Sequence, residues 1–377
     1  MKWSLYIGKA GGTKIFIHWS FLLLIVWVVV ENYRQGSSHL QTFNSTLFIL
    51  VVFVCVLLHE LGHTFTAQNF NYHTRDITLL PIGGMARMDE IPENPKHELL
   101  VAVAGPIVNL LIAIFLFPFI YWFGQIPPLT GMFLQNPNFF LFNLFTINIA
   151  LAVFNLIPAF PMDGGRIFRA FLTFFTNRVK ATAIAARTGQ LIALGFLFLG
   201  ILYNPVLAII GVFIFIMAQA EANYVKSKSL LHDYSVRDVL MKKYFSVDAF
   251  DTINDAVMLL LDVQSTDFLV TEKGNVIGTL NRDRIIQALA SKGKDTPVVL
   301  FMNPTIKFLS PDMPLDKVFV QLQASATSLL PVMENGRLIG AVDLANILEF
   351  ILIRSAVEKN ILYKEKDRTI NLHAAAT

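Results

Sequence analysis

The sequence predicts an α-helical membrane domain followed by a smaller soluble α/β domain. Hydrophobic residues make up 54% of the 377 residues and charged residues only 15%, against about 25% charged residues in an ordinary soluble domain. The mean hydropathy is +0.56. After Ala222 the composition shifts, and charged residues alternate with β-branched ones. The chain therefore divides into a membrane part and a soluble part.

Six apolar segments are predicted to be membrane-spanning helices. A span needs about 20 residues, because roughly 30 Å of hydrocarbon is crossed at about 1.5 Å per residue. The predicted spans are residues 15–30, 46–70, 99–123, 139–157, 183–203 and 205–222. The third span contains Gly105, Pro106 and Asn109, which we interpret as residues that kink the helix or let helices pack closely.

The basic residues predict that both termini are cytoplasmic. Lys and Arg precede the first span and follow the second and fourth, whereas the other loops between spans carry at most one basic residue. Short loops rich in Lys and Arg stay on the cytoplasmic side. The net charge of +3 comes largely from these residues and suits a lipid bilayer better than nucleic acid. We expect a multi-pass protein of the cell membrane with no nucleic-acid partner.

A candidate metal site lies near the end of the second span. His59, Glu60 and His63 form the pattern H-E-x-x-H, and residues four apart on a helix lie on the same face. Both imidazoles can then bind zinc, while the carboxylate beside them acts as a general base. Ionisable groups inside an apolar helix are costly in lipid unless they serve a cavity or an ion. This cost favours a metal site over a chance match.

Asp163 is the candidate for the third protein ligand that a catalytic zinc site needs. It follows the fourth span in a segment with two prolines and two glycines. Non-helical backbone at this depth is tolerated only around a protein-lined cavity. Taken alone, Asp163 would serve equally well as the N-cap of a helix over residues 166–175. Cys55, one turn before His59, would close the site as a fourth ligand, so we expect a packed thiol there.

These two segments resemble the site-2 protease family of intramembrane zinc metalloproteases. The first part of the match is H-E-x-x-H, and the second is N-x-x-P-x-x-x-x-D-G from Asn155 to Gly164. The resemblance covers roughly residues 14–222. It implies one zinc ion per chain on His59, His63 and Asp163, with Glu60 as the base. It also implies that Asn155 helps to hold the substrate or the oxyanion, although this amide would alternatively bond backbone carbonyls near Pro158.

Residues 77–88 are predicted to form short strands around a Gly83-Gly84 turn. A peptide must be extended to be cut, and a strand beside the metal can hold it by β-augmentation. The family resemblance supports that role. A hairpin that merely covers the site at the membrane surface is an equal alternative.

The soluble part contains an internal repeat. Met241 and Met302, like Asp255 and Asp316, are 61 residues apart, and Gly278 and Gly340 are 62 apart. Each half predicts a helix, a strand, a Gly turn, a second strand and a second helix. The predicted helices are residues 253–261 and 315–323, and the first strands are residues 268–271 and 328–332. The repeats resemble a pair of cystathionine-β-synthase (CBS) domains, as in one branch of the site-2 protease family.

The predicted domain boundaries follow from these features. They are a transmembrane domain over 1–225, CBS repeats over 226–290 and 291–358, and a polar tail over 359–377.

The CBS resemblance raises the question of adenine nucleotides, for which such pairs form clefts. The positions for the hydroxyl side chain hold Asn281 and Asp343, and those for the ribose-binding carboxylate hold Arg284 and Asn346. A carboxylate is thus missing at both ribose positions, with Asp283 one residue early. We predict that the pair acts mainly in homodimer formation or gating and binds adenine nucleotide weakly.

The leading function is hydrolysis of peptide bonds in transmembrane substrate proteins near the cytoplasmic side, under control of the CBS pair. A zinc-binding transporter or sensor is the first alternative, but an ion pathway would want more charged residues, and it gains nothing from Glu60. A membrane protease of the prenyl-protein type needs a Glu ligand on a later helix, where only Glu221 occurs, at an edge.

Overall fold

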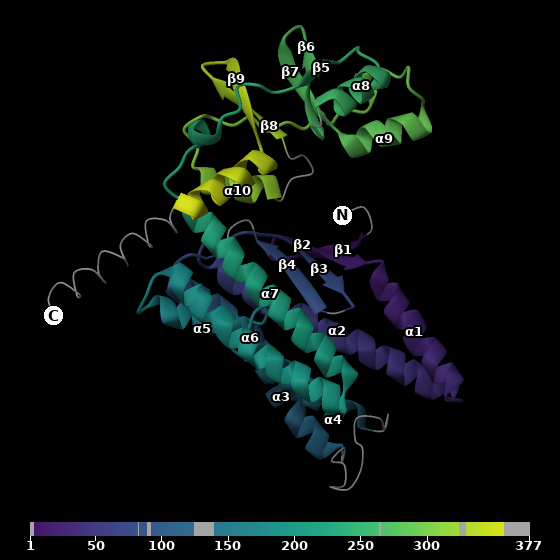
Figure 1. Ribbon diagram of the computed structural model, residues 1–377. Coiled ribbons are helices and arrows are strands. Elements are labelled where there is room, and N and C mark those ends of the chain that lie inside the picture. Colours follow the sequence, from purple (N-terminus) through teal and green to yellow (C-terminus); the bar gives the residue numbers. More distant parts are fainter. Residues whose placement is uncertain are drawn as a thin grey trace, which may run out of the picture. The chain divides into compact units, whose positions relative to one another are not determined.

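The computed structural model describes residues 4–81, 83–88, 92–123, 139–263, 265–323 and 329–357. The chain forms two compact units, Met1–Asn223 and Tyr224–Thr377. Long helices dominate the first unit, and the second consists of two small sheets with short helices (Figure 1). The predicted division into a helical domain with a small sheet insertion and a smaller α/β domain agrees with these two units.

Four helices in the described residues are long and apolar enough to cross a membrane. They are α2 (His39–Gln68), α3 (Pro95–Trp122), α6 (Arg178–Tyr203) and α7 (Pro205–Leu230). The fourth predicted span corresponds to a shorter apolar helix, α4 (Phe140–Asn155), and the first corresponds in part to α1 (Ser20–Arg34). A short helix, α5 (Asp163–Thr173), lies between α4 and α6 in sequence. The loop predicted between the third and fourth spans lies outside the described residues.

The predicted start of the first span is wrong. Residues 15–18 belong to strand β2 (Thr13–His18), and α1 begins only at Ser20. Buried Thr13 and Ile15 alternate with exposed Lys14, the period of two that a strand requires. A short apolar run with β-branched residues suits a strand as well as a helix, and here pairing with a strand distant in sequence decides. The 15 residues of α1 extend about 22 Å, less than the hydrocarbon thickness of about 30 Å.

The predicted strands after α2 belong to a four-stranded sheet at one end of the helix bundle (Figure 1). Its order is β1 (Ser4–Ala10), β2, β3 (Thr74–Leu80) and β4 (Gly83–Met88). β2 and β3 run parallel with Ile15 opposite Ile77, and the other pairs are antiparallel. Gly11 and Gly12 join β1 to β2 with φ of 52° and 87°, as a two-residue hairpin turn requires. β4 is an edge strand.

Helices in the first unit approach each other closely where glycines occur. A Cβ on Gly62 of α2 would lie 2.8 Å from a Val108 methyl group of α3, and one on Gly200 of α6 would lie 2.2 Å from the Ala208 nitrogen of α7. Large apolar side chains such as Leu191, Phe198 and Ile209 are exposed on the outer faces. Small residues inside and apolar residues outside are what helices packed in lipid require.

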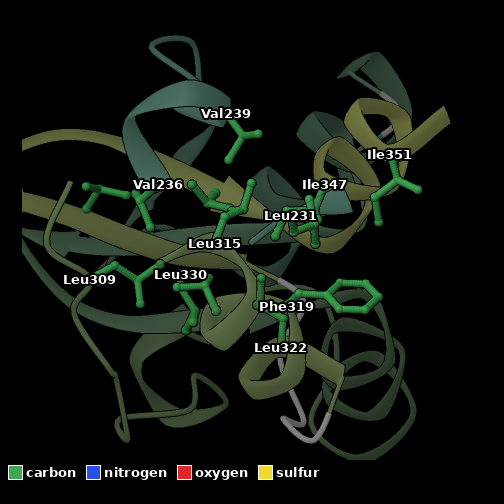
Figure 2. Close-up of a cluster of buried hydrophobic side chains, with 13 residues drawn as sticks. Leu231, Val236, Val239, Leu309, Leu315, Phe319, Leu322, Leu330, Ile347 and Ile351 are labelled. Carbon is green, nitrogen blue, oxygen red and sulfur yellow. The ribbon is translucent and has the colours of Figure 1, made fainter. Parts of the chain in front are cut away.

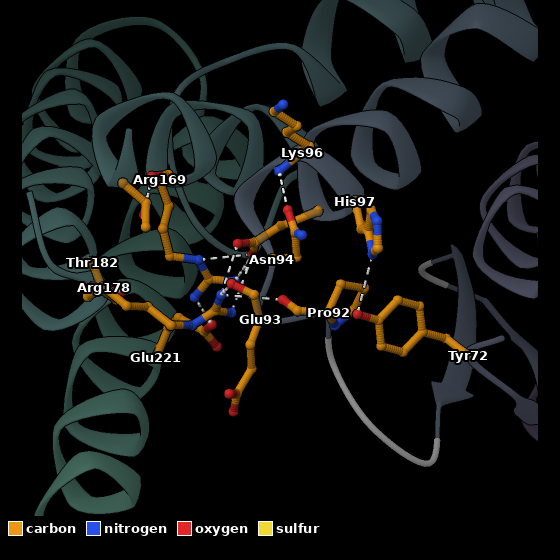
Figure 3. Close-up of polar contacts among 12 residues, drawn as sticks. Tyr72, Pro92, Glu93, Asn94, Lys96, His97, Arg169, Arg178, Thr182 and Glu221 are labelled. Carbon is orange, nitrogen blue, oxygen red and sulfur yellow. Dashed lines mark hydrogen bonds and ion pairs between the residues drawn. The ribbon is translucent and has the colours of Figure 1, made fainter. Parts of the chain in front are cut away.

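A buried ionic cluster joins α3, α5, α6 and α7. Arg169 of α5 binds Glu98 of α3 and Glu221 of α7, and Arg178 of α6 donates to Glu98 over 3.0 Å. Figure 3 shows Arg169, Arg178 and Glu221 pointing toward one another from their helices. From the sequence, Arg169 and Arg178 are expected only as basic residues that mark the cytoplasmic face, and Glu221 has no expected partner.

The second unit contains the two predicted repeats. The first comprises β5 (Ser246–Asp248), α8 (Ile253–Val263), β6 (Asp267–Glu272), β7 (Asn275–Asn281) and α9 (Arg282–Ser291). The second comprises α10 (Leu315–Gln323), β8 (Leu329–Glu334), β9 (Arg337–Asp343) and a helix over residues 344–357. Each repeat thus follows the predicted order of helix, strand, strand and helix.

The repeats are interlocked. Met241, ahead of the first repeat's sheet, bridges to Ala341 of the second, and Asn303 bridges back to Thr279 of the first. Figure 2 shows Leu231, Val236 and Val239 within one buried cluster that also contains Leu315, Phe319 and Ile347 of the second repeat. The segment before the first repeat therefore completes the core of the second, so the pair is a single folding unit.

Candidate metal centre

His59 and His63 lie one turn apart on α2, and α3 packs against their face. Gly105 of α3 makes the close approach: a Cβ there would lie 2.3 Å from His63 Nε2 and 2.6 Å from His59 Nε2. Only glycine leaves room for both rings. The sequence predicts only general helix packing for Gly105, whereas in the structure this residue packs against the candidate ligands themselves.

Asp163 meets the two histidines from α5. Its Oδ2 lies 3.2 Å from each Nε2, and the two Nε2 atoms are 3.1 Å apart. Tetrahedral zinc holds ligand atoms at about 2.0–2.2 Å, which places any two of them about 3.3 Å apart. The three side chains are 8%, 12% and 11% exposed. The triangle of ligand atoms therefore has the size that a zinc ion requires.

Hydrogen bonds fix which nitrogens point into this triangle. His63 Nδ1 lies 2.7 Å from the Val101 carbonyl oxygen, which only accepts, so this nitrogen carries the hydrogen and Nε2 presents a lone pair. His59 Nδ1 bonds Asn109 Oδ1 in the same way. Asp163 Oδ2 is buried without a hydrogen-bond partner in the described residues. Three lone-pair atoms thus face one another with no proton between them, an arrangement that suits a bound cation.

Asp163 owes its position to the two glycines that follow it. A Cβ on Gly164 would lie 2.2 Å from the Ile157 oxygen, and one on Gly165 would lie 2.7 Å from the Ala159 carbonyl carbon. The start of α5 therefore packs directly on the turn after α4. Met162, not Asp163, is the N-cap of α5, and no side chain caps it. The alternative role of Asp163 as a helix cap is wrong.

Glu60 lies beside strand β4. It is half-buried, and a Cβ on Gly84 would lie 2.5 Å from its Cγ and 3.0 Å from its Oε1. The backbone of an edge strand therefore passes directly against this carboxylate.

Asn155 is the last residue of α4, half-buried, and its amide makes no side-chain hydrogen bond to any described residue. The alternative in which it bonds carbonyls near Pro158 is thus not found in the described part of the chain.

Cys55 does not belong to the metal centre. Its thiol is buried among Leu116, Ile120 and Leu144. Within the described ranges, the group of ligand atoms that can hold a metal consists of His59, His63 and Asp163. Three protein ligands leave a fourth position open, as a catalytic zinc site requires.

Asn109 and Asn148 are site residues that the sequence analysis missed. Both are fully buried, and Asn109 Nδ2 donates to Asn148 Oδ1 over 2.9 Å. The signal was present in the sequence, since buried amides in apolar spans are costly unless they are hydrogen-bonded. The sequence interpretation gives Asn109 only a packing role and includes no role for Asn148 of the fourth span.

A buried His-His-Asp set with a neighbouring glutamate in apolar helices, followed by a CBS pair, defines a membrane metalloprotease with a regulatory domain. Residues 47–197 match Peptidase family M50, and residues 236–291 and 298–353 each match the CBS domain family. The chain is 31% identical over 365 residues to "Zinc metalloprotease MJ0392" of Methanocaldococcus jannaschii, covering 95% of this chain and 99% of that protein. The chain belongs to peptidase family M50.

Among solved structures, "Site-2 Protease from Methanocaldococcus jannaschii" matches with 36% identity and a TM-score of 0.43, covering 58% of this chain and 95% of that one. The resemblance inferred from the two sequence segments is confirmed by the family match and the full-length relative. Family membership also favours a protease over the transporter and the prenyl-protein alternatives.

Proposed function

We propose that this protein cleaves transmembrane substrate proteins within or next to the bilayer, on its cytoplasmic side, with one zinc ion per chain on His59, His63 and Asp163. The observation that carries the proposal is the triangle of three lone-pair atoms, 3.1–3.2 Å on each side, inside apolar helices. Zinc, when bound, polarises a carbonyl group and makes a water molecule acidic near neutral pH.

Glu60 is the proposed base. Its carboxylate follows His59 on the ligand helix and forms no ion pair with a described residue, so it is available to take a proton. In the proposed reaction the water oxygen bonds to the carbonyl carbon while Glu60 accepts a water proton. As the carbon–nitrogen bond breaks, Glu60 passes this proton to the leaving nitrogen.

Asn155 is proposed to donate its amide to the carbonyl oxygen as negative charge develops there. Two observations support this role. The amide has no side-chain partner in the described residues, and Asn155 precedes the turn that places Asp163.

The edge of β4 is the proposed binding place for the extended substrate. β4 pairs with β3 on one side only within the described sheet, and its Gly84 packs on Glu60. A peptide that adds to this edge by β-augmentation would run beside the base. The close contact with Glu60 favours this role over a hairpin that only covers the site.

The proposed location is the cell membrane, with several crossings and both termini cytoplasmic. The four long apolar helices and their exposed apolar side chains support insertion in lipid, and the basic loops support the orientation. The CBS pair is proposed to regulate cleavage through homodimer formation or gating.

Cleavage of single-span membrane substrates by the purified protein in liposomes tests the proposal. Glu60→Gln removes the base but no ligand, so we expect full zinc content and no cleavage. Glu31→Gln, a change at a half-buried residue of α1 that pairs with Arg34 and accepts from Gln35, is the matched control and should cleave normally. Cleavage by Glu60→Gln at more than a few per cent of the wild-type rate would overturn the assignment.

Asp163→Ala tests the third ligand. We expect loss of both zinc and cleavage, measured as metal content per chain. Full zinc content in this variant would show that Asp163 is not a ligand.

A further inference from the structure

A line of buried amides leads from His59 to the interior of α4. His59 Nδ1 bonds Asn109 Oδ1 of α3, and Asn109 Nδ2 donates to Asn148 Oδ1 of α4 over 2.9 Å. Asn148 Nδ2 donates in turn to the Leu144 carbonyl oxygen over 2.8 Å. Asn109 and Asn148 are both 0% exposed. Three helices that pack side by side are thus connected by polar bonds inside an apolar bundle.

The Leu144 carbonyl, at the end of this series of hydrogen bonds, determines which atom donates and which accepts in each of them. The Leu144 carbonyl can only accept, so Asn148 must present its NH₂ group to it and its oxygen to Asn109. Asn109 then donates through Nδ2, and its oxygen faces His59. An amide oxygen cannot donate, so His59 Nδ1 must carry the hydrogen. The lone pair of His59 is consequently on Nε2, toward Asp163.

The two histidines differ in how they are oriented. His63 Nδ1 donates to a backbone oxygen, that of Val101, which no side-chain substitution removes. The His59 ring depends on a side chain, that of Asn109. Substitution at Asn109 therefore changes the support of one ligand and leaves that of the other in place.

We propose that Asn109 is a positioning residue for zinc binding, held in its orientation by Asn148. It fixes both the tautomer and the ring plane of His59 before the metal arrives. This inference rests on the proposed zinc site. Partners of this kind, which orient metal-bound histidines, typically contribute about 10–100-fold to metal affinity.

The test is zinc affinity, measured by competition with a chromogenic chelator on the full-length protein in detergent. Asn109→Leu keeps the approximate side-chain volume but removes the acceptor, so we expect the zinc Kd to rise about 10–100-fold. Saturating zinc should then restore much of the cleavage. Cobalt substituted for zinc should show an altered absorption band, because one ligand is no longer held in its plane.

Asn109→Asp is the conservative variant. Its carboxylate still accepts from His59 Nδ1, although Asn148 Oδ1 loses its donor, so we expect a zinc Kd much closer to the wild-type value than that of Asn109→Leu. Thr64→Val is the matched control on the ligand helix. Thr64 is buried beside His63, and its hydroxyl has no hydrogen-bond partner in the described residues, so its loss should leave the zinc Kd unchanged.

Wild-type zinc affinity in Asn109→Leu would overturn the inference and leave the proposed function standing. Absence of zinc binding by the wild type would instead overturn the proposed function. If Asn109→Leu does not fold, Asn148→Leu tests the same proposal. It leaves Asn109 in place but free to turn, so zinc affinity should still fall, and an unchanged Kd would again contradict the proposal.

Discussion

Arg169 of α5 donates hydrogen bonds to Glu98 of α3, although both side chains are almost fully buried, 1% and 3% exposed. Glu221 and Arg178 complete the cluster. Burying a charge is costly unless it is paired. Because α5 begins with the candidate ligand Asp163, this cluster also holds in place the short helix that presents the ligand.

Glu98→Gln should destabilise the protein strongly. It leaves Arg169 and Arg178 with a neutral neighbour, and breaking a buried ion pair costs about 3–5 kcal/mol. The measurement is the thermal unfolding midpoint in detergent. Arg237→Ala is the control, because its pairs with Asp312 and Glu334 are exposed, so we expect no resolvable change. A wild-type midpoint for Glu98→Gln would show that the cluster contributes little.

Gly105→Ala should abolish zinc binding. The added methyl carbon would lie 2.3 Å from His63 Nε2 and 2.6 Å from His59 Nε2, so the rings must move apart or α3 must shift. Zinc per chain in the purified variant is the measurement. Gly195→Ala on α6 meets nothing within 4 Å and should keep its zinc. Equal zinc content in both variants would contradict the role assigned to Gly105.

Asp343→Asn should stabilise the second repeat near neutral pH. Burial raises the pKa of Asp343, the bond from the Asn346 N–H lowers it less, and the Asp267 and Glu349 carboxylates add to the rise. The folded state therefore holds the Asp343 proton more tightly than the unfolded state, so stability falls as the pH rises through the raised value. The neutral Asn keeps the oxygen that accepts from Asn346 N without this cost.

Amide hydrogen exchange over residues 329–357 measures this effect. The stabilisation by Asp343→Asn should be present at about pH 7 and shrink toward about pH 4, near the ordinary carboxyl pKa. Asp255→Asn is the control of opposite sign. Hydrogen bonds from Thr252 lower the pKa of Asp255. Loss of the Asp255 carboxylate charge should therefore destabilise α8 at neutral pH and less so in acid. If both substitutions changed stability in the same direction at neutral pH, the pKa shifts would not explain the effect.

The sequence was informative wherever the chemistry depends on close spacing. His59, Glu60 and His63 lie within one turn of a helix, so their shared face follows from the helical period alone. Asp163 was assigned because few other ligands exist in the apolar segments and because a family pattern includes it. The strand at 15–18 was misassigned, since a short apolar run does not by itself distinguish strand from helix.

The contacts that could not be predicted are those that depend on how helices cross. Gly105 and Asn109 face the histidines only because α3 packs on that side of α2. Glu98 and Arg169 are 71 residues apart, and no periodic pattern connects them. The roles of these residues depend on tertiary contacts, which local sequence propensity does not predict.

The positions of the CBS pair at which a nucleotide contact was expected form hydrogen bonds with the protein's own backbone. Arg284 donates to the carbonyl oxygens of Phe301 and Met302 over 3.0 and 3.1 Å. Asn346 Nδ2 donates to the Val239 oxygen over 2.7 Å. Asn281 and Asp343 accept from the backbone N–H groups of Arg284 and Asn346. A nucleotide would have to displace these bonds while finding no carboxylate at either ribose position.

We therefore expect ATP, ADP and AMP to bind weakly, with no saturation at micromolar concentrations. Equilibrium titration of the full-length protein in detergent, with cleavage followed in parallel, is the measurement. Arg284→Asp and Asn346→Asp each supply the missing ribose acceptor. The first frees two backbone carbonyl oxygens and the second frees one, so a gain of affinity in either variant over the wild type supports this explanation. Micromolar binding by the wild type that also alters cleavage would show that the pair is a nucleotide sensor, and the displaced backbone bonds would then be part of its response.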